Sequence, residues 1–209
     1  MLAAAVLAWA CLRLVLAALA RLGLWTRSPQ RALAVFGSGG HTTELVVLIK
    51  QGALARAREA LFVHAATDSS SRAHIDALRS TKSPNVPDAI HVASVPRSRE
   101  VAQSYASSVV TTAYASVHAL VHVARFQPDL VLVNGPGTCL PYALAAIGLR
   151  TLGLLPGVRV VYVESIARVH SLSLTGKLLR PFVDQFHVQW PQLLTKLGQS
   201  AFYHGSRIS

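Results

Sequence analysis

Short apolar runs rich in β-branched residues alternate along this chain with longer stretches whose apolar residues recur at helical spacing. The runs predicted as strands are 32–36, 60–65, 90–95, 130–134, 159–164 and 185–190. Two of the predicted helices cover 68–79, with Asp68 or a following serine as the N-cap, and 100–126. Because apolar strands that alternate with helices are typical of a parallel sheet covered on both faces, the pattern predicts one doubly wound, Rossmann-like α/β domain over 32–209.

The N-terminal segment is one continuous apolar run, much longer than the runs predicted as strands. Residues 2–20 carry a single charge, Arg13, and a helix of this length spans about 30 Å, roughly one hydrocarbon core. A cleaved signal peptide is the competing interpretation, but its charged region would precede the apolar core. The pattern therefore favours an uncleaved transmembrane anchor over 1–25 and a linker over 26–31. Arg13 would have to snorkel to the interface or find a partner.

Basic residues outnumber acidic ones, with Lys+Arg 20 against Asp+Glu 9 and a formal charge of +11. Nucleic acid, an anionic membrane surface and phosphorylated ligands are all electrostatically suitable partners, and charge alone does not choose among them. By the positive-inside rule, basic residues after the apolar segment place the body on the cytoplasmic side. These residues are Arg21, Arg27 and Arg31. The chain has two cysteines and no Asn-x-Ser/Thr acceptor, which fits a reducing cytosol.

A glycine-rich loop, GSGG at 37–40, follows the first predicted strand and leads into a helix near Thr42. Such a loop leaves backbone N–H groups uncovered beside the positive end of a helix, which suits a phosphate. A dinucleotide fingerprint is the first alternative, but Thr42 stands where its third glycine belongs. Asp68 also lies more than 30 positions beyond Gly37, where a ribose-binding acid is expected about 20 positions on. A tight turn without a ligand is the second alternative.

His41 leaves this loop at the edge where the carboxyl ends of parallel strands open into a crevice. A neutral imidazole there can accept a proton from a sugar hydroxyl or donate a hydrogen bond to a phosphate, because it titrates near neutrality. A capping or packing role is the alternative. Glu44, three residues later, is expected to interact with the helix dipole or to form half of a capping box with His41 or Thr42.

Two further strand ends are expected to converge on the same crevice. The fourth strand leads into NGPGTCLP, in which Asn134 offers a donor and an acceptor and Thr138 can cap the next helix. The fifth strand places Glu164 and Ser165 at its carboxyl end. The alternatives are that the prolines of these turns only end elements and that Glu164 pairs with Arg168, four residues on.

Other polar residues carry weaker signals. Arg97 and Arg99 flank Ser98 after the third strand, and paired guanidinium groups suit phosphate oxygens, although a solvated loop explains them equally well. His118 and His122 have the i, i+4 spacing of metal ligands, but no third ligand stands near them in the sequence.

Six stretches, taken together and in this order, carry a family resemblance. They are GSGGHTTE (37–44), PRSRE (96–100), PDLVLVNGPGTC (128–139), VYVESIARV (161–169), LSLTGK (172–177) and VQWPQL (188–193). With the N-terminal segment, the chain resembles the membrane-bound subunit of the UDP-N-acetylglucosamine transferase of asparagine-linked glycosylation, the family numbered fourteen.

The resemblance implies half an enzyme. Family members resemble the amino-terminal domain of a two-domain GT-B glycosyltransferase, similar to the bacterial enzyme that adds N-acetylglucosamine to a lipid-linked peptidoglycan precursor. A soluble catalytic subunit holds most of the UDP-N-acetylglucosamine. The pair extends dolichyl-diphosphate-N-acetylglucosamine by a second N-acetylglucosamine on the cytosolic face of the endoplasmic reticulum membrane. The resemblance implies recruitment of the partner through 185–209, contact with the preceding enzyme of the lipid-linked pathway, and no nucleic acid.

The resemblance also implies roles for residues. His41 and Glu164 are the candidate catalytic residues, one as base for the acceptor's 4-hydroxyl and the other orienting it. The candidate phosphate- and acceptor-binding residues are Gly37, Ser38, Gly39, Gly40, Thr42, Arg97, Arg99, Asn134, Gly135, Gly137, Thr138 and Ser165. No metal and no cofactor are required. A membrane recruiter without catalytic residues is the main alternative, and a membrane-tethered nucleotide oxidoreductase is the weaker one.

Overall fold

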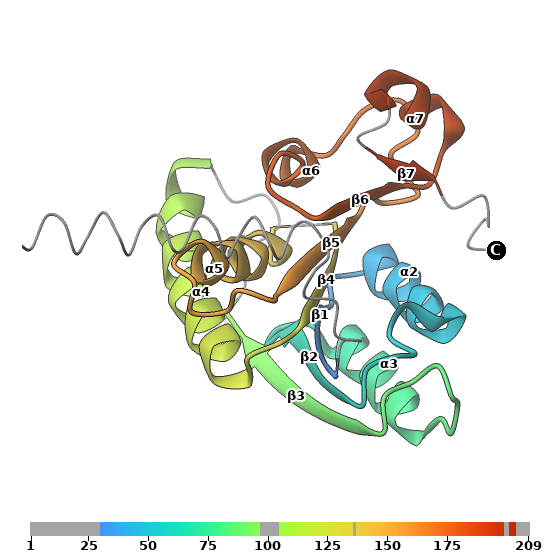
Figure 1. The fold of residues 1–209 in the computed structure, drawn as a ribbon, viewed down its shortest axis with the longest axis vertical. Helices are drawn as coiled ribbons and strands as arrows, with labels where there is room; N and C mark the ends of the chain where they lie inside the picture. The colour runs from blue at the N-terminus through green and yellow to red at the C-terminus, as the bar shows by residue number, and fades with distance from the viewer. Residues whose placement is uncertain (1–29, 97–104, 136, 199–200, 204–209) are drawn as a thin grey trace, which may run out of the picture.

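One parallel sheet forms the centre of the molecule. The computed structural model describes residues 30–96, 105–135, 137–198 and 201–203. Within these residues, seven strands run in the order β3-β2-β1-β4-β5-β6-β7 (Figure 1). The strands are β1 (Arg31–Val35), β2 (Glu59–Ala65), β3 (Ala89–Val95), β4 (Leu130–Asn134), β5 (Arg159–Val163), β6 (Gln185–Val188) and β7 (Phe202–Tyr203).

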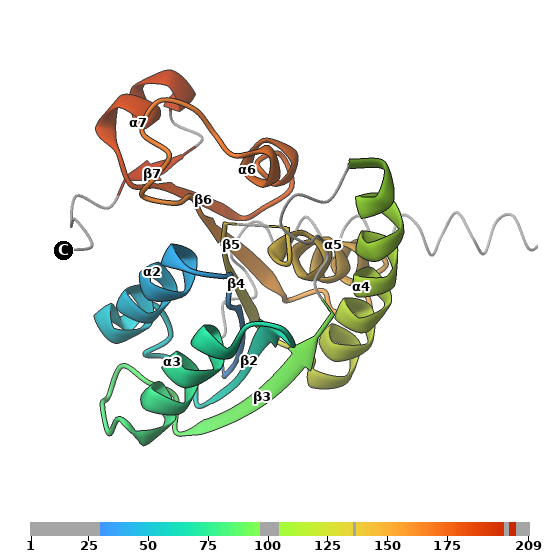
Figure 2. The ribbon, with the colours of Figure 1, turned by 180° about the vertical axis from the view of Figure 1, so that it is seen from behind.

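Helices connect the strands and cover the sheet on both faces (Figures 1 and 2). They are α2 (Gly40–Leu48), α3 (Ser69–Ser80), α4 (Tyr105–Phe126), α5 (Cys139–Thr151), α6 (Leu174–Leu179) and α7 (Pro191–Leu197), with a π-helical turn, η1 (Ile49–Ala53), after α2. The helix α3 begins where its sequence predicts, because the Asp68 carboxylate accepts a hydrogen bond from the Ser71 N–H at 3.0 Å.

The strand order reverses between β1 and β4. The chain moves outward from β1 to β2 and β3 on one side, then returns through α4 to β4 and moves outward in the other direction. Residues 32–35 of β1 pair with 130–133 of β4, all in parallel. In sheets of this kind the connections leave the carboxyl ends of the two central strands in opposite directions, which opens a crevice there.

Two hydrophobic cores lie on opposite faces of the sheet, and alternate side chains of β1 enter them. Leu33 and Val35 join the core beneath α4 and α5, whereas Ala32 and Ala34 join the core beneath α2 and α3. All four side chains are fully excluded from water. Burying a leucine or valine side chain stabilises the fold by about 1.5–3 kcal/mol, so β1 is a stable base for the loop that follows it.

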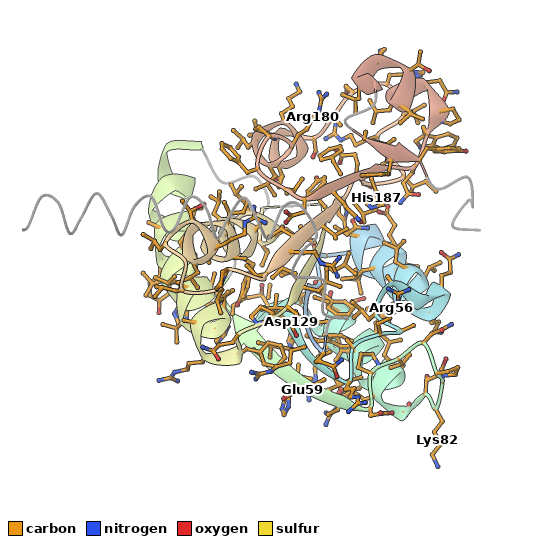
Figure 3. All side chains as sticks on the ribbon, viewed as in Figure 1. Arg56, Glu59, Lys82, Asp129, Arg180 and His187 are labelled. Atoms are coloured by element: carbon orange, nitrogen blue, oxygen red, sulfur yellow. The ribbon has the colours of Figure 1, made fainter. Side chains whose placement is uncertain are left out.

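The amino ends of the strands are held together at the opposite edge. The Asp129 carboxylate accepts hydrogen bonds from the N–H groups of Gln30 and Arg31, each at 3.0 Å. Glu59 pairs with the Arg31 guanidinium at 3.1 Å and with His91 at 2.8 Å. Figure 3 shows the labelled Asp129 and Glu59 together at this end of the sheet. The charges of these residues therefore serve the fold and lie away from the carboxyl-end crevice.

The predicted parallel α/β domain is confirmed, with strand boundaries close to those expected. The two-residue edge strand β7 was not predicted, and α2 begins at Gly40, two residues before the expected start. The predicted anchor over 1–25 and most of the linker over 26–31 lie outside the described residues. Among the helices that are described, none has both the length and the apolar character that crossing a bilayer requires.

Candidate functional site

The glycine-rich loop at 37–40 forms an open corner at the carboxyl end of β1. Gly39 precedes α2 with φ 61° and ψ −128°, a left-handed conformation that favours glycine. A Cβ atom placed on Gly39 or Gly40 would meet no heavy atom within 4 Å, and Ser38, Gly39 and Gly40 are exposed. The first turn of α2 contains no acidic residue. The corner therefore has the space, the backbone N–H groups and the positive dipole end that an anion requires.

Thr42 supports this corner from inside the protein. Its side chain is fully buried, and its hydroxyl donates to the Gly37 carbonyl and lies within hydrogen-bonding distance of the Ser71 hydroxyl. The Thr42 N–H bonds to the Gly39 carbonyl at 3.1 Å. Both polar groups of Thr42 are thus engaged by the protein, so Thr42 shapes the loop and does not face the open space.

A second glycine turn follows β4 and lies beside the first, because β1 and β4 are neighbours. Gly135 has φ 83°, and a Cβ atom on Gly137 would meet nothing within 4 Å. Thr138 occupies the N-cap position of α5, as expected, but its side chain makes no capping hydrogen bond. Both turns therefore lie at the switch point of the sheet, and the Cβ positions of Gly39, Gly40 and Gly137 are free of contacts.

The His41 imidazole lies directly against Gly135. A Cβ atom on Gly135 would fall 2.2 Å from His41 Nδ1 and 2.4 Å from Cε1, distances that no packed side chain tolerates. His41 Nδ1 is 3.1 Å from Asn134 Oδ1, and the side chain remains 28% exposed. Glycine at position 135 is therefore required for the His41 ring to occupy this place beside the second turn, where the side chain stays partly exposed.

Glu44 lies at the centre of the site, although the sequence reading gave it only a helix-capping role. Its Oε2 accepts from Asn134 Nδ2 at 3.1 Å, and its Oε1 accepts from the Ser165 hydroxyl at 2.8 Å and the Ile166 N–H at 3.3 Å. The side chain is only 8% exposed, and Oε2 lies 4.0 Å from His41 Nδ1. Glu44 thus joins α2 to the ends of β4 and β5. The signal available in the sequence was its helical spacing from His41, which places both on one face of α2.

Glu164 ends β5 as predicted, but its carboxylate is directed to α6. Oε2 accepts from the Ser173 N–H at 2.9 Å and the Ser173 hydroxyl at 3.1 Å, and Oε1 accepts from the Ser165 N–H at 3.1 Å. A Cβ atom on Gly176 would fall 2.4 Å from Oε2. Glu164 is fully buried, and no contact among the described residues joins it to His41.

Ser165 separates the two glutamates. Its N–H donates to Glu164 on one side, and its hydroxyl donates to Glu44 on the other. The structure therefore brings His41, Asn134, Gly135 and Ser165 together as predicted, adds Glu44, and places Glu164 behind them. Arg97 and Arg99 lie outside the described residues.

The surroundings shift the pKa values of several other titratable groups near the sheet. Burial raises the pKa of the Cys139 thiol to about 12, so this side chain stays protonated. Burial, followed by the charge of Glu164, raises the pKa of Tyr162 far above its usual value. Burial lowers the pKa of His122, assisted by the charges of His118 and Arg125, and His122 bonds to the Tyr142 hydroxyl at 2.7 Å. Among the described residues no three potential ligands gather as a metal site requires.

A separate hollow of about 920 Å³ lies between the segment after α2 and strands β4 to β6. Its floor is apolar and includes Leu132, Val161 and Val163, and Arg56 and His187, both labelled in Figure 3, line it as well. No residue of the loop at 37–40 lines it. The hollow is therefore distinct from the region around His41.

Comparison with known proteins identifies the family. Residues 32–206 match the family described as "Oligosaccharide biosynthesis protein Alg14 like". The chain belongs to the Alg14 family. A Mus musculus relative named UDP-N-acetylglucosamine transferase subunit ALG14 is 44% identical over 186 residues, which are 84% of this chain and 82% of that protein. A Yarrowia lipolytica relative of the same name is 39% identical over 208 residues, 97% of this chain and 95% of that protein.

The fold of this Alg14 family member is similar to that of a solved bacterial protein. The crystal structure of MurG from Acinetobacter baumannii superimposes with a TM-score of 0.60 at 17% identity, over 85% of this chain and 46% of that chain. At this identity the similarity concerns the fold alone, a Rossmann-like domain of the GT-B kind. The chain spans about half the length of this solved structure.

Proposed function

We propose that this chain is the membrane-anchored, acceptor-side subunit of a two-chain glycosyltransferase. The reaction would transfer N-acetylglucosamine from UDP-N-acetylglucosamine to dolichyl-diphosphate-N-acetylglucosamine, the second step of lipid-linked oligosaccharide synthesis. The observation that carries the proposal is the unobstructed glycine corner beside His41 at the switch point of the sheet. The names of the relatives, each a subunit of a UDP-N-acetylglucosamine transferase, supply the donor sugar.

The glycine corner at 37–40 and His41 have separate proposed roles toward the acceptor, one in binding its diphosphate and the other in accepting its proton. The N–H groups at 37–40 and the start of α2 hold the acceptor's diphosphate, which is doubly favoured by hydrogen bonding and by the helix dipole. His41 accepts the proton of the 4-hydroxyl as its oxygen bonds to C1 of the donor sugar. The bond from C1 to the phosphate oxygen breaks in the same step, and UDP leaves. Positive groups and helix N-termini stabilise the charge on the leaving diphosphate.

The relatives are each named a subunit of a UDP-N-acetylglucosamine transferase, which supports a partner subunit for this chain. The C-terminal portion at 185–209 is the proposed contact surface. Gln185, His187 and Gln189 line the hollow under β4 to β6, and the edge strand β7 presents Phe202 at 50% and Tyr203 at 38% exposure. An apolar hollow next to an exposed sheet edge is a combination that binds another protein chain by packing and strand pairing.

The proposed location is the cytosolic face of the endoplasmic reticulum membrane, and exposed apolar side chains on the helices α4, α5 and α6 support contact with a membrane. These helices lie side by side on one face of the sheet (Figures 1 and 2). Large apolar side chains on these helices and on the segments just after α5 and α6 are 40–61% exposed: Tyr114, Val117, Leu120, Val121, Leu144, Leu152, Leu154, Leu174, Leu178 and Phe182. We define these ten residues as the apolar face. An exposed surface of this kind is typical of contact with lipid or another protein.

Charge favours lipid over protein as the occupant of the apolar face. Between 105 and 183 the sequence contains two acidic residues, Asp129 and Glu164. The first is engaged at the amino edge of the sheet and the second is buried. The exposed Lys177 and Arg125 lie on α6 and α4. Each basic residue near an anionic bilayer contributes about 1 kcal/mol of attraction.

Co-expression with candidate soluble partners tests the proposal. The purified chains, separately and together, are assayed for transfer of N-acetylglucosamine to a short-chain lipid diphosphate carrying one N-acetylglucosamine. We expect transfer only when both chains are present. Transfer by this chain alone, or by the partner alone at the same rate, would contradict the two-chain arrangement. Inorganic diphosphate should compete with the acceptor, because both occupy the corner at 37–40.

A further inference from the structure

We propose that Glu44 acts through Asn134 to fix the tautomer of His41, so that Nδ1 carries the proton and Nε2 carries the lone pair. The inference rests on the proposed function for its catalytic meaning, but the hydrogen-bond argument stands on the structure alone. Glu44 touches neither the corner at 37–40 nor any reacting atom, so it is a positioning residue.

The first step is the orientation of the Asn134 amide. One end of this amide lies 3.1 Å from Glu44 Oε2 and the other lies 3.1 Å from His41 Nδ1. A carboxylate only accepts hydrogen bonds, so the NH₂ group must face Glu44 and the oxygen must face His41. An amide oxygen also only accepts, so Nδ1 must be the donor. The Glu44 carboxylate, connected to His41 by two hydrogen bonds through Asn134, therefore determines the tautomer of His41.

The second step is what holds Glu44 in the accepting role. Its other oxygen receives the Ser165 hydroxyl at 2.8 Å and the Ile166 N–H at 3.3 Å. The Ser165 oxygen accepts the Ala167 N–H at 3.2 Å, which leaves its single proton for Glu44. Every partner of the carboxylate is therefore a donor. The loop after β5 fixes the carboxylate, the carboxylate fixes the amide, and the amide fixes the imidazole.

The third step concerns the free edge of the imidazole. The His41 ring occupies the space that a Cβ atom on Gly135 would fill, and the hydrogen bond between Nδ1 and Asn134 Oδ1 at 3.1 Å holds the ring in this orientation. No residue in the described part of the chain bonds to Nε2, and the side chain is 28% exposed. At 4.0 Å, Glu44 is too far from Nδ1 for a direct hydrogen bond, which makes Asn134 the necessary intermediate. The Nδ1–H tautomer thus presents the lone pair of Nε2 to the acceptor side.

The variant Glu44→Gln makes a sharp prediction, because glutamine has one oxygen in place of two. The oxygen should turn to Ser165 and Ile166, since the Ile166 N–H cannot change its role. The NH₂ group then faces Asn134, whose amide must flip and present its own NH₂ to His41. Nδ1 becomes an acceptor, so the tautomer of His41 inverts and Nε2 acquires the proton.

Imidazole ¹⁵N chemical shifts, measured on the full chain with ¹⁵N-labelled histidine, report the tautomer directly. We expect wild-type His41, assigned by its loss in His41→Gln, to have a protonated Nδ1 and an unprotonated Nε2. Glu44→Gln should exchange the two shifts and lower kcat of the reconstituted pair by about tenfold to hundredfold, with KM within about twofold. The matched carboxylate-to-amide variant Glu59→Gln, at the amino edge of the sheet, should leave the ¹⁵N shifts of His41 and kcat unchanged.

The possible outcomes separate the two proposals. A wild-type spectrum with Nε2 protonated would overturn the inference without any variant, and so would an unchanged tautomer in a folded Glu44→Gln chain. An inverted tautomer with full turnover would leave the inference standing and would instead contradict His41 as the base. The wild-type measurement alone decides the matter if Glu44→Gln fails to fold.

Discussion

At the scale of single residues, the site depends on one position that has no room for a side chain and on one carboxylate whose oxygens are both hydrogen-bonded within the protein. Gly135 has no side chain because the His41 ring occupies the space of its Cβ atom. Glu164 has no free oxygen because four donors from α6, β5 and the following loop approach its carboxylate. The first arrangement fixes the position of His41, the proposed base, and the second joins the end of β5 to the start of α6.

Replacing Gly135 with alanine should separate these effects. The new methyl group would overlap His41 Nδ1. Alanine would also have to adopt φ 83°, a conformation that costs about 1–2 kcal/mol for a residue other than glycine. We expect kcat of the reconstituted pair to fall at least tenfold, roughly the loss expected from a displaced catalytic group. Gly148→Ala in α5, where a Cβ atom meets nothing within 4 Å, is the matched control. Equal turnover in both variants would show that the position of His41 is immaterial.

Glu164→Gln should act on stability and not on chemistry. Glutamine offers one oxygen, so either the two donors from Ser173 or those from Ser165 and Tyr162 would face an NH₂ group. An unpaired buried polar group costs about 1–3 kcal/mol, which denaturant unfolding can measure. At denaturant concentrations below the unfolding transition, turnover of the reconstituted pair should be retained. A chain of unchanged stability that has lost turnover would instead assign Glu164 as the base.

The sequence predicted which residues lie at the edge of the sheet better than it predicted where their side chains point, and the reason is physical. Asn134 ends β4, Ser165 lies two residues after β5, and His41 follows the loop after β1, so parallel topology alone brings them to one edge. The direction of a side chain at a strand end depends on where the chain turns next. Glu164 points to α6 because Ser173 lies there, and Glu44 reaches two strands away across the crevice. These long-range contacts have no local signature.

At the scale of elements, the apolar face on α4, α5 and α6 leads to a prediction about membrane contact. In the full chain reconstituted into anionic liposomes, with Cys11 replaced by serine, an environment-sensitive dye on Leu178→Cys should report an apolar environment. The reason is that α6 carries exposed Leu174 and Leu178 beside Lys177. A dye on Ala77→Cys, exposed on α3 on the other face of the sheet, is the matched control.

The liposome composition distinguishes the occupants of this face. We expect the blue shift at position 178 to weaken when anionic lipid is replaced by neutral lipid or when salt is raised, because basic residues contribute to the contact. The dye at position 77 should respond to neither change. Identical emission from both positions in anionic liposomes would contradict lipid contact through α6.

The elements themselves were largely predictable, because buried parallel strands are apolar along their whole length. The expected strands at 130–134 and 90–95 match β4 and β3 to within one residue. The edge strand β7 escaped prediction because two residues show no periodicity. The start of α2 was placed too late because Gly40 is a poor helix former, yet the open corner allows the helix to begin there.

At the scale of the whole molecule, the strand order agrees with the comparisons, which place the chain in the Alg14 family and relate its fold to about half of a larger solved structure. The doubly wound sheet was predictable from the alternation of strands and helices, and the order of its motifs indicated the family. The proposed partner subunit could not be inferred from periodicity or spacing, because neither pattern identifies another chain. What this chain contributes to the proposed enzyme, chemistry or recruitment alone, is the central question.

Turnover of His41→Ala in the reconstituted two-chain enzyme tests that question most directly. The variant is compared with wild type at equal amounts of purified complex, so that recruitment of the partner is held constant. Because a positioned general base contributes about 10²–10⁴-fold, we predict that kcat falls at least hundredfold while the two chains still co-purify. Turnover within about twofold of wild type would contradict the account and leave this chain as a membrane recruiter.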